Sequence, residues 1–256
     1  MTEDAEQIGV KPVWGESVLK AWWKKALFIM GALLLLFIFQ YEMNTNDTGG
    51  SWQTPLAGKV IVLDPGHGGP DGGAVGKGPV VEKDISLAIS HDLKHYLQQA
   101  GALVLMTREK DQDLADEDTK GLSRRKTQDL HRRVEFVNQT DPNIVVSIHL
   151  NAIPSPRWNG AQTFFDPHVE ESQHLAKFIQ DSLRFHLENT TRFAKAINTV
   201  YLLKTVDVPA ALVEVGFLSN PEEKDLLKTE PYQKSVAASI YQGILRYYGG
   251  EPVPEQ

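Results

Sequence analysis

The chain has 256 residues, of which 41% are hydrophobic, and a formal net charge of −7. This length and composition predict one globular domain with an appended segment. The negative charge gives no general attraction to nucleic acid, so we expect no nucleic-acid partner. The absence of cysteine excludes disulfides and zinc-thiolate sites, which leaves His, Asp and Glu as the side chains that could hold a metal.

The first part of the chain is typical of a membrane anchor. Residues 26–39, ALFIMGALLLLFIF, form an unbroken apolar run with lysines before it and aromatic residues on both sides. The run is shorter than the roughly 20 residues of a spanning helix, but Lys24 and Lys25 can extend their ammonium groups toward the lipid headgroups. The alternative is a cleaved signal peptide that exports the protein, although no Ala-x-Ala site follows the run. We expect a cytoplasmic tail at 1–20, a transmembrane signal-anchor helix at 21–41, and a linker at 42–58, with the remainder outside the cytoplasm.

Beyond the linker, short β-branched runs alternate with longer amphipathic ones. This alternation predicts a single α/β domain over residues 59–248, followed by a C-terminal tail at 249–256. Asp84 is expected to cap the first helix of this domain and Gly101 to end it. The expected sheet has about six strands with helices on its faces. The expected strands are 59–63, 102–106, 144–149, 161–165, 200–203 and 210–215, and the expected helices are 85–100, 123–138, 170–187 and 232–247.

A glycine-rich loop, DPGHGGPDGGAVG, follows the first expected strand. It lacks the Gly-x-Gly-x-x-Gly and Gly-x-x-x-x-Gly-Lys patterns of nucleotide-binding loops. Its glycines instead suit a sharp turn that leaves the imidazole of His67 open to a ligand. Asp64, just before the turn, is a candidate to accept the second N–H of that imidazole, as ligand histidines usually require.

Three more residues suggest a site at the edge of the sheet. His149 comes at the end of an apolar strand, NIVVSIHLNA, where open α/β sheets build their sites. Glu214 lies inside another, PAALVEVGFLSN, where an unpaired carboxylate is costly. It is either paired with an arginine such as Arg108 or Arg133, or a general base with a raised pKa beside a metal. Glu82 precedes a helix in VVEKD, so two histidines and two glutamates together fit a His/His/Glu zinc site with a base.

The segments DPGHGGPDGGAVG, EKD, SIHLNA and LVEVGFLSN resemble the motifs of the zinc-dependent N-acetylmuramoyl-L-alanine amidases. TKGLSRRKTQDLHRRV, LNAIPS and HLENTTRFAK are similar to the germination-specific members of spore-forming bacteria. The resemblance implies a mixed six-stranded sheet flanked by helices, Zn²⁺ bound by His67, Glu82 and His149, and Glu214 as the catalytic glutamate. Asn151 is a candidate to bind substrate.

The implied reaction is hydrolysis of the amide between the lactyl group of N-acetylmuramic acid and L-alanine in peptidoglycan. Glu214 would accept a proton from the attacking water and return it to the leaving amine. In the spore cortex this is the first step toward muramic δ-lactam, which germination requires, and a polysaccharide deacetylase acts next. A lipoprotein activator is a further expected partner. Near the site, Asp64 and Arg133 are candidates for supporting roles, Arg133 by anchoring its helix to the sheet.

Three alternatives remain open. The first is a vegetative or division amidase of the cell wall. The second is an inert, amidase-like wall-binding scaffold, because a fold does not guarantee activity. The third is a zinc peptidase acting on stem peptides, which would need a site for a terminal carboxylate, and the sequence contains no convincing arginine motif for one.

Overall fold

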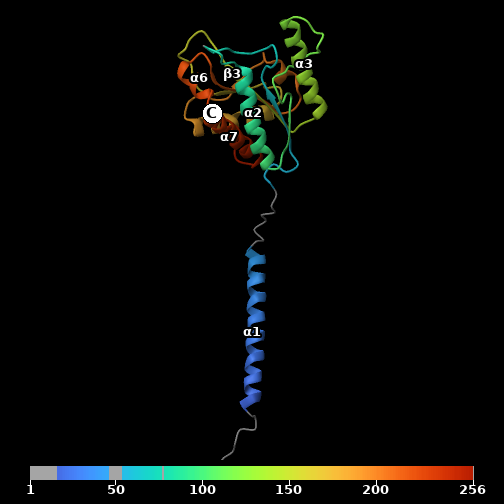
Figure 1. Ribbon diagram of the computed structural model, residues 1–256, viewed down its shortest axis with the longest axis vertical. Helices are drawn as coiled ribbons and strands as arrows, with labels where there is room; N and C mark the ends of the chain where they lie inside the picture. Colours follow the sequence, from blue (N-terminus) through green and yellow to red (C-terminus); the bar gives the residue numbers. More distant parts are fainter. Residues whose placement is uncertain (1–15, 46–53, 77, 256) are drawn as a thin grey trace, which may run out of the picture. The chain divides into compact units, whose positions relative to one another are not determined.

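The computed structural model describes residues 16–45, 54–76 and 78–255, which belong to two compact units, Met1–Trp52 and Gln53–Gln256. In the first unit one long helix is described, α1 (Glu16–Thr45), which contains the helix predicted at 21–41 (Figure 1). Residues 1–15 of the predicted tail and 46–53 of the predicted linker lie outside the described residues.

The described apolar side chains of α1, from Trp22 to Ile38, are exposed. None of the helices, taken over the residues that the structure describes, reaches the length and hydropathy of a membrane span.

The second unit is an α/β domain built on a mixed sheet of six strands in the order β2-β1-β3-β6-β4-β5. β2, β1, β3 and β6 are mutually parallel, β4 runs antiparallel to β6, and β5 is parallel to β4. The prediction of a mixed six-stranded sheet is therefore confirmed. The strands are β1 (Val60–Pro65), β2 (Leu103–Met106), β3 (Ile144–Asn151), β4 (Gln162–Phe165), β5 (Lys195–Ala196) and β6 (Ala210–Phe217).

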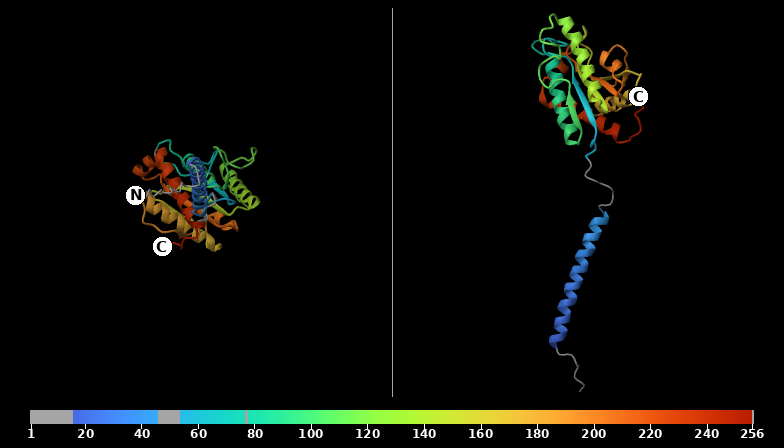
Figure 2. Two further views of the ribbon diagram at one scale, coloured as in Figure 1. Left: turned by 90° about the horizontal axis from the view of Figure 1, so that it is seen from below. Right: turned by 90° about the vertical axis from the view of Figure 1, so that its right-hand side faces the viewer.

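Both faces of the sheet are covered, and this explains the near-continuous apolar runs of the central strands. On β3, Val146 belongs to the core cluster under α2 (Glu82–Gln99), α4 (Glu170–Leu187) and α7 (Glu230–Tyr248). Its neighbour Val145 packs in a second cluster under α3 (Leu122–Thr140) and α5 (Tyr201–Thr205) (Figure 2). The helices expected over 123–138, 170–187 and 232–247 are confirmed to within two residues at each end.

The fifth strand was predicted at the wrong place. Residues 201–205 form α5, in which the N–H of Val206 donates to the carbonyl of Leu202, and the strand beside β4 is Lys195–Ala196. A short apolar run such as VYLL has no period that separates a buried strand from a buried helical turn. The short helix α6 (Pro221–Leu227) was not predicted at all, although Pro221 and the capping Asn220 are ordinary signals of a helix start.

The start of α2 also differs from the prediction, and this difference concerns the site. The helix begins at Glu82, after an extended Val81, so Asp84 lies in the first turn and is not the cap. A bridge between Val75 and Val81 holds Val81 extended, and the helix starts at the next residue. Gly101 follows the helix with a φ of 93°, as the prediction of a glycine stop requires.

Candidate active site

The predicted site residues come together at one edge of the sheet. His149 lies in β3 and Glu214 in β6, as partners in register, while His67 follows β1. Because β1, β3 and β6 are parallel, their carboxyl ends meet at this edge. The first turn of α2 adds Glu82 from above the same edge.

The glycines of the loop after β1 allow these side chains to approach one another. A Cβ on Gly66 would lie 2.4 Å from the His149 ring, and one on Gly73 would lie 2.5 Å from both Glu82 Oε2 and the His67 ring. His67 itself has a φ of 62°, which only a strongly supported loop imposes on a non-glycine residue. The loop therefore holds the His67 imidazole close to Glu82 and His149.

The carboxylate of Glu82 lies between the two imidazoles. Oε1 is 2.9 Å from His149 Nδ1 and Oε2 is 3.2 Å from His67 Nε2. Backbone N–H groups of Ala74 and Leu150 donate to the same two oxygens, at 2.7 and 2.8 Å. Burial opposes ionisation of Glu82, but its hydrogen bonds with His149 and His67 hold its pKa below the ordinary value.

These three side chains fit a zinc ion. One donor atom from each of His67, Glu82 and His149 lies within 4.8 Å of the others. Two imidazoles and one carboxylate form a donor set that catalytic Zn²⁺ sites use, and such sites leave one position open for water or substrate. A small pocket of about 110 Å³ opens beside the two histidines and is also lined by Asp71, Lys126 and Leu130.

His67 is oriented by Asp71 and not, as predicted, by Asp64. Asp71 Oδ2 is 2.7 Å from His67 Nδ1, which leaves Nε2 facing Glu82. Asp71 also forms an ion pair with Lys126 at 3.0 Å. A carboxylate four residues after the histidine, in the same glycine-rich loop, was the signal available in the sequence.

Asp64 is instead part of a buried network beneath the loop. Its carboxylate accepts hydrogen bonds from Thr107 Oγ1 at 2.7 Å, Ser147 Oγ at 2.6 Å and Arg133 Nη1 at 2.7 Å. Burial alone would raise the pKa of Asp64, but Arg133, with Ser147 and Thr107, lowers it to about 2. The side chain is therefore an ionised anchor whose hydrogen bonds go to Thr107, Ser147 and Arg133.

Arg133 anchors α3 to the sheet, as predicted, and also supports the site. Its guanidinium donates to the backbone oxygens of Pro65 and His67, at 2.8 and 2.6 Å, and pairs with Asp129 as well as Asp64. The arginine thus fixes the strained backbone at the residue that carries the first imidazole.

Glu214 differs from Glu82 and Asp64 in that one of its carboxylate oxygens has no hydrogen-bond partner among the described residues. Neither arginine considered as its partner is paired with it, because Arg108 donates to the carbonyls of Pro65, Gly66 and Lys83 and Arg133 binds Asp64. Glu214 Oε2 is buried and has no hydrogen-bond partner among the residues that the structure describes. Burial raises the pKa of Glu214 to about 7, which His149 and His67 partly oppose. A carboxyl group in this state can exchange a proton near neutral pH.

Asn151 ends β3 at the same edge, two residues after His149, and its register partner is Phe217. The register between β3 and β6 shifts between His149 and Asn151. The predicted substrate contact of Asn151 stays a prediction.

Comparison with known proteins agrees with this geometry. A family model for N-acetylmuramoyl-L-alanine amidases, Amidase_3, matches residues 61–246. The germination-specific N-acetylmuramoyl-L-alanine amidase of Bacillus subtilis is 55% identical over 221 residues, which cover 86% of this chain and 93% of that protein.

Two solved structures are similar as well. The CwlD amidase from Clostridioides difficile, solved in complex with the GerS lipoprotein, has a TM-score of 0.74 and 40% identity over 75% of this chain and all of that one (100%). The catalytic domain of CwlV from Bacillus (Paenibacillus) polymyxa has a TM-score of 0.66 and 31% identity over 75% of this chain and 99% of that one. The sequence match and the shared fold together show that the chain belongs to the N-acetylmuramoyl-L-alanine amidase family and is of the germination-specific type.

Proposed function

We propose that this enzyme cleaves the amide bond between the lactyl group of N-acetylmuramic acid and L-alanine with Zn²⁺ held by His67, Glu82 and His149. The observation that carries the proposal is the carboxylate of Glu214, whose buried Oε2 has no hydrogen-bond partner in the described residues, beside a His/Glu/His group. A structural carboxylate at this depth would have a cation or several donors, as Asp64 does.

The bound zinc ion would supply Lewis acidity, lowering the pKa of water toward about 7 and polarising the scissile carbonyl. Glu214 accepts the proton of the attacking water and then donates it to the leaving amine of L-alanine. Burial raises the pKa of Glu214 in the metal-free site, which brings its proton exchange nearer to neutral pH. Asp71 holds the His67 ring, and Arg133 holds the backbone beneath it. Asn151 contacts the substrate at the same edge.

The proposed setting is the spore cortex, where removal of the stem peptide prepares muramic acid for conversion to muramic δ-lactam by a polysaccharide deacetylase. Support comes from the identity to the Bacillus germination-specific amidase. The GerS lipoprotein bound to the C. difficile CwlD amidase supports a lipoprotein activator for this chain too. The apolar run at 26–39, with lysines before it, supports a membrane anchor and a catalytic domain outside the cytoplasm.

The test is mass spectrometry of cortex peptidoglycan digested by the full-length protein, with Zn²⁺ and with a chelator. We expect glycan with free lactyl carboxylates and peptides with a new L-alanine amino terminus, in the zinc sample alone. Shortened stem peptides would instead show that the enzyme is a zinc peptidase. If the peptidoglycan is unchanged with zinc, and also after a cognate lipoprotein is added, the protein is an inert scaffold.

A further inference from the structure

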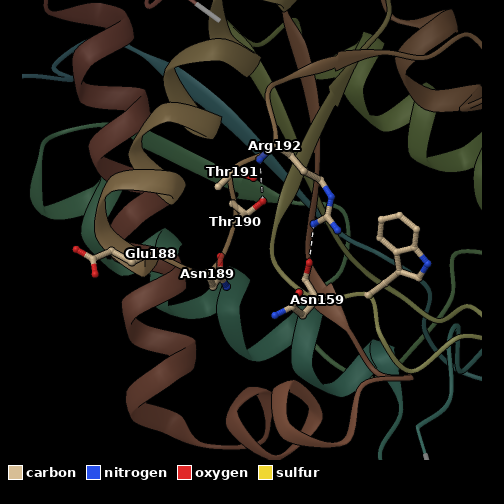
Figure 3. A pocket seen from close by; sticks show the side chains of 7 residues that line it. Asn159, Glu188, Asn189, Thr190, Thr191 and Arg192 are labelled. Carbon is tan, nitrogen blue, oxygen red and sulfur yellow. Dashed lines mark hydrogen bonds between the residues drawn. The ribbon is translucent and has the colours of Figure 1, made fainter.

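A second pocket, of about 490 Å³, is lined by residues 158–159 and 188–192 (Figure 3). The first segment leads into β4 and the second into β5. β4 is antiparallel to β6 and β5 is parallel to β4, so both segments lie at the sheet edge where the candidate active site is built. The volume is within the roughly 300–1,000 Å³ of typical small-molecule sites.

The two segments are joined closely. Figure 3 shows Arg192 directed at Asn159, and its Nη1 donates to the backbone oxygens of Asn159 and Gly160 at 2.6 and 2.9 Å. Gly160 has a φ of 84°, and a Cβ there would lie 2.2 Å from the carbonyl oxygen of Asn189. The pocket wall is therefore held by packed backbone and hydrogen bonds, which is how a binding site is preorganised.

The same wall is tied to the strand that carries the catalytic glutamate. The buried carboxylate of Glu223 accepts hydrogen bonds from the N–H of Gly160 and the N–H of Phe217, both at 2.8 Å. Phe217 is three residues beyond Glu214 in β6. The spacing between the pocket and the candidate active site is thus fixed by the sheet.

The chemistry of the pocket suits a sugar. Trp158 is 51% exposed and its ring is steadied by the Arg192 guanidinium, 5.6 Å from the ring centroid. Asn189 Oδ1 is buried without a hydrogen-bond partner in the described part of the chain, and Thr191 is exposed beside it. A pyranose ring presents C–H groups on its faces, which pack on an aromatic ring, and hydroxyls at its rim, which bond to amides and side-chain hydroxyls. An anion is favoured less, because the guanidinium already donates to two carbonyls.

We propose that this pocket is a glycan subsite. It binds an N-acetylated sugar ring of the peptidoglycan strand, near the muramic acid whose lactyl amide is cleaved, and so rests on the proposed function. From β3 across β6 to β4 are two strand intervals, or about 10 Å at ~4.8 Å each. A few linked sugar rings cover this distance. The subsite would select glycan strands over isolated muramyl peptides.

Isothermal titration calorimetry tests the subsite with a tetrasaccharide of alternating N-acetylglucosamine and N-acetylmuramic acid. This probe lacks stem peptides and therefore contains no scissile bond. We expect saturable binding to the full-length protein, and at least tenfold weaker binding to Trp158→Ala. Phe185→Ala is the matched control, since Phe185 is 74% exposed and lies outside the pocket. No binding by the unaltered protein, or equal binding by Trp158→Ala, would overturn the inference.

Fluorescence locates the binding independently. The chain has five tryptophans, and replacing Trp14, Trp22, Trp23 and Trp52 by Phe leaves Trp158 as the sole indole of the full-length protein. We expect the tetrasaccharide to shift the emission of Trp158, with the same affinity as calorimetry gives. An unchanged spectrum while calorimetry still detects binding would mean that the sugar binds elsewhere. If zinc-dependent peptide release is observed but the tetrasaccharide does not bind here, the subsite is wrong and the amidase function stands. If peptide release is absent, the function fails whatever the sugar does.

Discussion

Asp64 and Glu214 lie on the two strands that flank β3, and their pKa values are shifted in opposite directions. Asp64 is buried, and so is the Oε2 atom of Glu214. On β1, a buried arginine and two hydroxyls surround Asp64 and lower its pKa to about 2. On β6, no cation or donor reaches Glu214 Oε2 within the described residues, and burial raises the pKa to about 7. Burial therefore yields a fixed anion or a proton-transfer group according to the partners supplied.

The largest expected effect comes from Glu214→Gln, which keeps the shape and removes the titrating group. We expect the rate of peptide release to fall by about 10²–10⁴-fold, the usual contribution of a general acid–base group. Bound zinc should remain at one ion per chain by atomic emission spectrometry. Glu135→Gln, an exposed substitution on α3, is the control. Near-normal turnover in Glu214→Gln would refute the assignment.

The substitution Arg133→Met tests the buried arginine that pairs with Asp64. It leaves Asp64 buried without its cation, and removal of one partner of a buried ion pair costs about 3–5 kcal/mol. Urea unfolding of the variant measures this cost. The neighbouring Arg132→Met removes an exposed pair with Asp116 and should cost less than about 1 kcal/mol. Equal losses in the two variants would mean that Arg133 is not an anchor.

The two carboxyls predict opposite pH dependences of stability. Because the folded pKa of Asp64 is depressed, its contribution of about 2 kcal/mol is present above pH 4 and is lost as the pH falls toward 2. The folded pKa of Glu214 is raised, so in the zinc-free protein the free energy of unfolding should fall by about 3 kcal/mol between pH 4.5 and 7.

Both slopes are checked by measuring the free energy of unfolding against pH and comparing each variant with the unaltered protein. Asp64→Asn should make the acidic slope shallower, with the lowered pKa of Glu82 maintaining the remainder, and Glu214→Gln should make the neutral slope shallower. A neutral slope that is undiminished in Glu214→Gln would assign it to another group.

The smallest expected effect concerns the support of His67. Asp71→Asn removes the charge that orients the imidazole, and loss of such a partner typically lowers metal affinity about 10–100-fold. Competition with a chromophoric chelator measures the affinity without reference to turnover. Asp225→Asn, on an exposed carboxylate of α6, is the matched control and should bind zinc normally. Unchanged affinity in Asp71→Asn would show that the loop backbone alone positions His67.

The sequence predicted the parts of the site that interrupt an apolar pattern. His149 and Glu214 are polar residues in strands that are otherwise buried, and His67 follows such a strand in a glycine-rich turn, so residue order was enough to find them. The partners that fix these residues come from far along the chain or from loop geometry. Arg133 reaches Asp64 across 69 positions, and Asp71 reaches His67 only because the loop turns back.

The same limit explains the errors in the fold. The fifth strand has two residues and owes its place to pairing with β4, because its own side chains are exposed and carry no alternation. The sugar pocket joins segments separated by about 30 positions, and neither has a pattern of its own. The position of β5 and the shape of the pocket depend on contacts between distant segments, and such contacts cannot be predicted from the local sequence.

We propose that three side chains hold the metal and that Glu214 stays free of it as the base. Anomalous diffraction at the zinc edge, from crystals of the full-length protein grown with Zn²⁺, tests this directly. We expect one peak about 2.0–2.2 Å from one atom each of His67, Glu82 and His149, with the Glu214 carboxylate outside bonding distance. A peak bonded to Glu214, or one absent from this group and present elsewhere on the chain, would contradict it.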